Sequence, residues 1–202
     1  MWHASGTTCK FGCSANTRPS IILRVPGKNI QINLGSGNEP KQGFVNLDRR
    51  RIPGIQLQGD VTALPFADGS CSHVWASSVL EHFEDPYSVL KEIHRVLTKD
   101  GAVNLRMPSP WSMAGHLDKT HVFLADLKLW RQILGGYFVQ VEVTAEGVRY
   151  RDNKLLTALQ YIAIRGLGMK EFCQTWEFKC SGKLDKTRIA YVPWWLEEKY
   201  GK

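Results

Sequence analysis

The sequence predicts an α/β fold with a mostly parallel sheet, because strand-like and helix-like stretches alternate along most of the chain. Residues 30–34 alternate apolar and polar side chains and lead directly into Gly35-Ser36-Gly37. Residues 86–97 instead place their apolar side chains on one helical face. Seven such strands connected by helices predict a three-layer sandwich, and two late strands around the last helix predict one antiparallel edge strand.

In the first half of the chain, strands are expected at residues 29–34, 44–48, 55–61 and 73–77. The segment 38–43 between the first two strands is short and contains Gly and Pro, so we expect a loop in place of a full helix. A helix is expected from Pro86, because Asp85 can cap it and proline is favoured at the first helical position. Lys99-Asp100-Gly101 is expected to end this helix.

In the second half, strands are expected at 102–107, 137–144 and 172–180, and helices at about 124–134 and 153–165. The domain itself is expected to span residues 28–182. Residues 1–27 are rich in Ser, Thr, Gly and Asn without periodicity, which predicts an arm or lid. Residues 183–202 are expected to form a C-terminal tail.

The composition is that of a globular chain: 202 residues, of which 43% are hydrophobic and 22% charged, are enough for one domain with a core. No apolar run approaches the roughly 20 residues of a membrane span, and the N-terminus lacks the features of a signal peptide. The odd count of five cysteines favours reduced thiols and a cytoplasmic location. The net charge of +7 favours anionic partners, but it is too diffuse to indicate nucleic acid.

Four motifs stand out along the chain: Asn33-Leu34-Gly35-Ser36-Gly37, the strand-ending Asp48, Gly59-Asp60-Val61 with the loop after it, and Ser77–Phe83. In this order they resemble the motifs of class I, Rossmann-like S-adenosylmethionine-dependent methyltransferases of the small type-11-like group. The resemblance covers roughly residues 28–145. Members of the most similar subgroup are often linked to sugar and glycan tailoring, which implies a small-molecule or sugar acceptor for O- or N-methylation.

The resemblance implies S-adenosylmethionine as cofactor and assigns residues to its parts. Carboxylate groups at Asp48 and Asp60 would accept hydrogen bonds from the ribose hydroxyls and from the adenine amino group. The backbone at the glycines can approach the methionine part closely, because no Cβ intrudes. The full set of expected cofactor-binding residues is Asn33, Gly35, Ser36, Gly37, Asp48, Asp60, Val61 and Ser77. Two positions depart from the methyltransferase loop motif. Asn33 stands where the family usually has an acid, and Glu39 stands where its loop usually has a third glycine, so the resemblance implies different contacts to the cofactor ammonium.

A hydroxyl acceptor needs a base to remove its proton, and the candidate bases are His82, His121 and Asp118. His121 is favoured, because Asp118-Lys119-Thr120-His121 resembles a D-x-T-H stretch of the same subgroup. His116, Asp118 and His121 do not have a standard metal-ligand spacing, so no metal site is expected.

Three other functions compete with this hypothesis. An RNA-directed methyltransferase would explain the basic charge and the N-terminal arm. A non-catalytic member would bind the cofactor or a partner protein only. A Rossmann protein that binds NAD is disfavoured, because Pro40 stands where the third glycine of G-x-G-x-x-G is needed.

Overall fold

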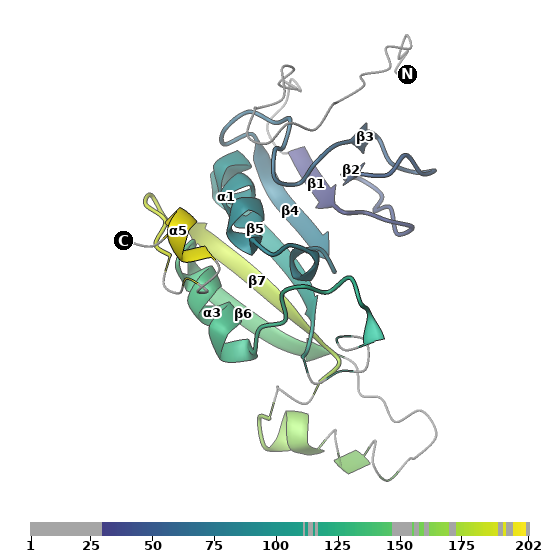
Figure 1. The fold of residues 1–202 in the computed structure, drawn as a ribbon, viewed down its shortest axis with the longest axis vertical. Coiled ribbons are helices and arrows are strands. Elements are labelled where there is room, and N and C mark those ends of the chain that lie inside the picture. The colour runs from purple at the N-terminus through teal and green to yellow at the C-terminus, as the bar shows by residue number, and fades with distance from the viewer. Residues whose placement is uncertain are drawn as a thin grey trace.

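The computed structural model describes residues 30–110, 112, 115, 117–146, 155, 158–159, 162–169, 173–189, 192 and 196–200. These residues form a seven-stranded sheet in the order β3-β2-β1-β4-β5-β7-β6 (Figure 1). The strands are β1 (Ile30–Leu34), β2 (Val45–Asp48), β3 (Leu57–Gln58), β4 (Cys71–Ser77), β5 (Leu97–Pro108), β6 (Phe138–Glu146) and β7 (Thr175–Lys183). The helices are α1 (Pro86–Val96), α3 (Leu127–Gly135) and α5 (Glu197–Tyr200), with short turns η1 (Leu80–His82) and η2 (Ile162–Gly166).

The mostly parallel sheet expected from the sequence is confirmed. Strands β1 to β5 pair in parallel, and β7 runs antiparallel to both of its neighbours. The antiparallel strand lies at one end of the sheet, between β5 and the outermost β6. The expected arm at 1–27 and most of the expected helix at 153–165 lie outside the described residues.

Several element boundaries differ from the expectation; β7, for example, lies three residues later than the expected 172–180. Strand β3 has two residues, Leu57 and Gln58, where 55–61 was expected. Helix α1 ends at Val96 and strand β5 begins at the next residue. Lys99–Gly101 therefore lie within β5, where the pairing with β4 is irregular, and do not end the helix as expected. Helix α3 starts at Leu127 and not at 124, because Asp126 caps it by accepting a hydrogen bond from the Leu129 backbone N–H at 2.7 Å.

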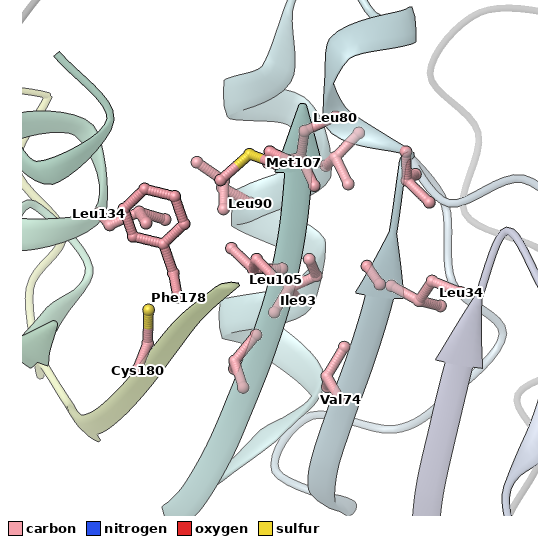
Figure 2. Close-up of a cluster of buried hydrophobic side chains, with 14 of the residues drawn as sticks. Leu34, Val74, Leu80, Leu90, Ile93, Leu105, Met107, Leu134, Phe178 and Cys180 are labelled. Carbon is pink, nitrogen blue, oxygen red and sulfur yellow. The ribbon is translucent and has the colours of Figure 1, made fainter. Parts of the chain in front are cut away.

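The core lies on one face of the sheet, where the alternation of apolar residues predicted it. One row of directly paired, buried side chains crosses six strands: Leu47, Leu34, Ala76, Leu105, Phe178 and Val143. In Figure 2, Leu90 and Ile93 of α1 cover this face at β5, and Leu134 of α3 lies against Phe178. Because burial of each such side chain contributes about 1.5–3 kcal/mol, this face supplies the main driving force for folding.

Helix α1 has the signals that the sequence predicted. The Asp85 side chain accepts a hydrogen bond from the Ser88 backbone N–H at 3.2 Å, and Pro86 occupies the first turn. The helix starts nine residues after the end of β4, and η1 lies between the two elements.

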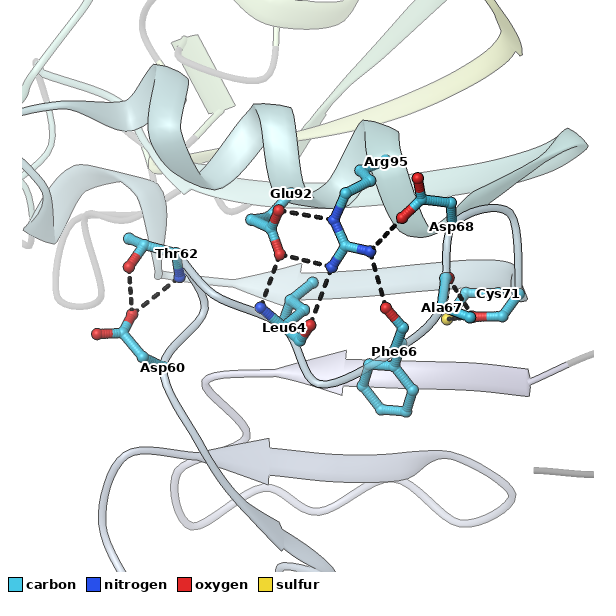
Figure 3. A network of polar contacts seen from close by, with 10 residues as sticks. Asp60, Thr62, Leu64, Phe66, Ala67, Asp68, Cys71, Glu92 and Arg95 are labelled. Atoms are coloured by element: carbon cyan, nitrogen blue, oxygen red, sulfur yellow. Dashed lines mark hydrogen bonds and ion pairs between the residues drawn. The ribbon is translucent and has the colours of Figure 1, made fainter. Parts of the chain in front are cut away.

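A network centred on Arg95 attaches the loop between β3 and β4 to α1 (Figure 3). The guanidinium donates to both Glu92 carboxylate oxygens at 2.8 and 2.7 Å and to Asp68 Oδ1 at 2.6 Å. It also donates to the carbonyls of Leu64 and Phe66 at 2.9 and 2.8 Å. The side chain is only 19% exposed, so the loop is held by a partly dehydrated charge.

The described part of the expected tail folds back onto the domain. The backbone N–H groups of Leu184 and Arg188 donate to the carbonyls of Tyr137 and Gly136 at 3.0 and 2.7 Å. Lys199 forms an ion pair with Asp85 at the start of α1. None of the described helices is long and apolar enough to cross a membrane.

Candidate active site

The glycine loop after β1 is shaped by two residues in the left-handed region. Gly35 and Gly37 have φ angles of 56° and 53°, and the Ser36 N–H between them donates to the Leu47 carbonyl at 3.0 Å. A Cβ on Gly35 would lie 2.6 Å from Val79 Cγ2. Glycine is therefore required at position 35 both by the backbone conformation and by the close approach of the turn that follows β4.

Asp48 ends β2, as expected, and its carboxylate is held against the glycine loop. Oδ2 accepts a hydrogen bond from the Gly37 N–H at 2.8 Å, and Oδ1 accepts one from the Arg50 N–H at 2.8 Å. Burial acts to raise the pKa of the Asp48 carboxyl, but these two N–H groups and the Arg50 guanidinium bring it below its ordinary value. Asp48 is thus a fixed, ionised acceptor with lone pairs to spare.

The other expected cofactor residues lie along the same edge. Asn33 is buried and donates to Asn46 Oδ1 at 2.8 Å and to the Glu39 carbonyl at 3.2 Å, which fixes the loop that replaces the usual helix. Asp60 lies in an exposed turn after β3, where its Oδ1 accepts from the N–H and hydroxyl of Thr62. Val61 beside it is buried.

Ser77 is the last residue of β4, and Ser78 after it has a φ of 53° although it is not glycine. The Ser78 N–H donates to the Arg106 carbonyl at 2.8 Å, which ties the turn to β5. Such a backbone conformation is uncommon outside glycine and often marks a functional turn. Turn η1 begins two residues later and carries Glu81 and His82.

A second group of side chains forms where η1 meets the loop before α3. The Glu81 carbonyl accepts hydrogen bonds from the N–H groups of Val122 and Phe123 at 2.8 and 3.0 Å. This backbone pairing places the His82 and His121 rings with centroids 4.9 Å apart. His121 Nε2 lies 3.7 Å from Asp118 Oδ2, so the three residues that the sequence proposed for catalysis are close together.

Both histidine rings are oriented by one nitrogen. His121 Nδ1 lies 3.1 Å from the Gly115 carbonyl, and His82 Nδ1 lies 3.2 Å from the Thr120 carbonyl. Because a carbonyl oxygen only accepts, each Nδ1 carries the proton and donates it. In the neutral imidazole, each Nε2 then holds the lone pair that can bind another partner.

Glu81 is a site residue to which the sequence assigned no role. Its side chain is 1% exposed, and neither carboxylate oxygen has a hydrogen-bond partner among the described residues. Oε1 lies 4.0 Å from His121 Nε2. Burial raises the pKa of the Glu81 carboxyl above its ordinary value, and its own backbone N–H, the His82 and His121 rings and the Ser78 side chain lower it only in part. Its position immediately before His82 was the signal available in the sequence.

Two further residues were missed. Thr120 accepts a hydrogen bond from His82 Nδ1 at its hydroxyl oxygen, 3.0 Å away, and donates to Asp118. These bonds from Thr120 lower the pKa of the exposed Asp118 carboxyl. Arg50, whose side chain is 64% exposed, forms an ion pair with Asp48 at 3.3 Å.

The sheet order and these loops define the class I methyltransferase fold. Residues 34–105 match the family model described as a methyltransferase domain. These residues run from the last residue of β1 into β5 and include all the expected cofactor positions except Asn33. Residues 34–105 are therefore similar to a methyltransferase domain, and the sheet has the fold of class I S-adenosylmethionine-dependent methyltransferases.

Solved structures share the fold at low sequence identity. One is an S-adenosylmethionine-dependent methyltransferase of Archaeoglobus fulgidus, with a TM-score of 0.55 and 16% identity over 77% of this chain and 86% of that one. Another is phosphoethanolamine N-methyltransferase 2 of Haemonchus contortus in complex with S-adenosyl-L-methionine, with a TM-score of 0.52 and 14% identity over 80% of this chain and 50% of that one.

A curated relative is an uncharacterized 37.1 kDa protein in transposon TN4556 of Streptomyces fradiae, 28% identical over 102 residues. That match covers 48% of this chain and 29% of the relative. The chain thus matches less than a third of the length of this relative.

The glycine loop fits the cofactor. A Cβ on Gly37 would meet only the Arg50 Nη2 atom, at 3.5 Å, and the backbone, at 3.8 Å. The Ser36 hydroxyl beside it is buried and has no hydrogen-bond partner among the described residues. A buried hydroxyl without a partner costs free energy, so a polar ligand at this loop would stabilise it.

Proposed function

We propose that this chain transfers the methyl group of S-adenosylmethionine to a small-molecule or sugar acceptor, by O- or N-methylation. The observation that carries the proposal is that the glycine loop, proposed to bind the cofactor, contacts the turn that carries the proposed catalytic residue His82. The glycine loop after β1 touches Val79, as the 2.6 Å distance to a Cβ on Gly35 illustrates. Val79 in turn begins the turn that carries Glu81 and His82.

The cofactor, when bound, supplies a methyl group on a sulfonium sulfur, which keeps the electron pair of the broken C–S bond. The residues of the chain then have to hold both reactants in line and to receive the acceptor proton. Positioning of this kind is worth about 7–11 kcal/mol of the barrier. Asp48 and Asp60 would hold the ribose and adenine, and Ser77, Ser36 and the glycine backbone would hold the amino-acid end.

On the acceptor side, His121, His82 and Asp118 form the proposed catalytic group. The lone pairs at Nε2 of both histidines are available, and Asp118 keeps a negative charge beside them. These groups would assist the departure of a hydroxyl proton, a contribution of roughly 10²–10⁴-fold. An amine acceptor would only have to be held in its neutral form.

Calorimetric titration of the purified chain tests the cofactor part of the proposal. S-adenosylmethionine and S-adenosylhomocysteine should bind with micromolar affinity, and NAD should not bind. Asp48→Ala should weaken both sulfur ligands at least tenfold, whereas the exposed Asp100→Ala should leave them unchanged. If neither sulfur ligand binds, the fold has been kept without the chemistry.

Acceptor screening follows, with release of S-adenosylhomocysteine as the readout. Sugars, small metabolites and RNA should be offered in parallel, because turnover on RNA with a steep salt dependence would favour the RNA-directed alternative. His121→Ala should lower turnover while cofactor affinity stays intact. Full activity of this variant would move the catalytic role to His82 or remove it.

A further inference from the structure

We propose that Glu81, His82 and His121 form a binding site for one divalent transition-metal ion, of which Zn²⁺ is the best match. Two imidazoles and one carboxylate are a common ligand set for a catalytic zinc ion, which leaves at least one coordination position open. The binding itself is independent of methyl transfer. Only its suggested role in catalysis rests on the proposed function.

The distances suit a site that closes on its ion. One ligand atom from each of the three residues lies within 4.8 Å of the others. Donor atoms bound to tetrahedral zinc at about 2.1 Å lie about 3.4 Å apart. Closure therefore needs movements of up to about an ångström and a half, and His82 is exposed at the surface and able to move.

The second coordination sphere is already in place. Histidines that bind metals usually donate their other ring N–H to a carbonyl or carboxylate, which fixes the tautomer. His121 Nδ1 donates to the Gly115 carbonyl and His82 Nδ1 donates to the Thr120 carbonyl. With the proton on Nδ1, Nε2 of each neutral ring is the nitrogen left to bind a metal ion.

Glu81 provides an independent observation in favour of a ligand. A carboxylate at 1% exposure whose two oxygens have no hydrogen-bond partner among the described residues is costly unless something compensates it. The nearest histidine nitrogen, His121 Nε2, is 4.0 Å from Glu81 Oε1, too far for a hydrogen bond. A cation between the three residues would satisfy the carboxylate and both lone pairs together.

This site was not expected from the sequence, which offered His116, Asp118 and His121 as a possible but non-standard ligand set. Glu81 and His82 are adjacent and lie far in sequence from His121. The N–H groups of Val122 and Phe123 bring the two segments together by binding the Glu81 carbonyl. His121 would then act as a ligand, and the acceptor oxygen could occupy the open position, where a metal lowers the pKa of a hydroxyl.

Metal binding is tested on the purified full chain after treatment with a chelator and dialysis. ZnCl₂, CoCl₂ and MgCl₂ are titrated separately by calorimetry, and bound metal is counted by mass spectrometry. We expect one Zn²⁺ or Co²⁺ per chain and much weaker binding of Mg²⁺. His82→Ala, in which an exposed side chain is removed, and His121→Ala should each weaken Zn²⁺ binding at least tenfold. His73→Gln, a histidine outside the cluster, is the matched control.

The absorption of bound Co²⁺ provides a second readout, because its intensity and position report the number and type of ligands. Glu81→Gln should change this spectrum or abolish it. The absence of stoichiometric Zn²⁺ and Co²⁺ binding, or binding that both histidine variants leave unchanged, would overturn the proposal. Titration of the same preparation with S-adenosylhomocysteine separates the two ideas: binding of this ligand without metal binding rejects only the metal site, and the reverse rejects only the methyltransferase function.

Discussion

Replacement of Gly35 by alanine should destabilise the chain by about 2–5 kcal/mol. Gly35 has a φ of 56°, and an alanine in this region costs about 1–2 kcal/mol. The added Cβ would lie 2.6 Å from Val79 Cγ2, well inside ordinary contact. Val79 is only 5% exposed and has little room to retreat, so we add the roughly 1–3 kcal/mol that overpacking costs.

Gly69→Ala is the matched control for this substitution. Gly69 has a φ of 63°, and a Cβ there would meet nothing within 4 Å. This variant should therefore lose only the conformational contribution of about 1–2 kcal/mol. The assay is urea unfolding of both variants, followed by circular dichroism and compared through the midpoint at constant slope.

The contact with Val79 can be isolated by a double-mutant cycle. In the Gly35→Ala/Val79→Ala chain the clash is relieved. The free energy of unfolding lost in the double variant should therefore be smaller than the sum of the losses in the two single variants, by at least about 1 kcal/mol. Equal destabilisation of the Gly35→Ala and Gly69→Ala chains, or simple additivity in the cycle, would show that the Val79 contact does not cause the loss of stability. Gly35→Ala should also weaken S-adenosylhomocysteine binding, and Gly69→Ala should not.

Three other predictions concern residues away from the glycine loop. Arg95→Met should lower the free energy of unfolding, measured by urea titration, by about 3 kcal/mol, because two carboxylates and two carbonyls lose the donor that they share. A loss below about 1 kcal/mol would show that the network is not what holds the loop. Burial lowers the pKa of His94 below its ordinary value, so the unfolded chain binds the proton first and stability should decrease as the pH falls below about 6.5. His94→Gln should flatten that part of the pH profile, and an unchanged profile would assign the effect elsewhere. Burial raises the pKa of the Cys71 thiol to about 11 and that of the Cys180 thiol to about 12. Both thiols should therefore resist alkylation by iodoacetamide at about pH 8 until the chain is unfolded. Rapid labelling of the native protein at these residues, mapped by peptide mass spectrometry, would contradict this.

Much of the fold follows from short-range patterns. The alternation in residues 30–34 places Ile32 and Leu34 on the buried face, and the structure confirms this. Asp85 and Pro86 predict the start of α1, because capping by Asp85 and the fixed φ of Pro86 are local properties of these residues. The expectation failed for β3, where Asp60 binds Thr62 and turns the chain after only two paired residues.

The glycine loop after β1 could also be predicted largely from the sequence. Glycines after a strand, and an acid at the end of the next one, are chemical requirements that appear as residue types at fixed spacings. What could not be foreseen is the use of those residues within the protein itself. Asp48 holds the N–H of Gly37, and Arg50 stabilises that carboxylate.

The sequence by itself determined the class of the fold, the buried face of each long strand, the capped start of α1 and the glycine loop. Each of these depends on residues within a few positions of one another. Only the tertiary structure decided that β7 inserts between β5 and β6, and that Glu81 lies buried beside His121. Those arrangements depend on contacts between distant segments, such as the Glu81 carbonyl with Val122 and Phe123, whose formation is a property of the whole packed chain and leaves no local pattern.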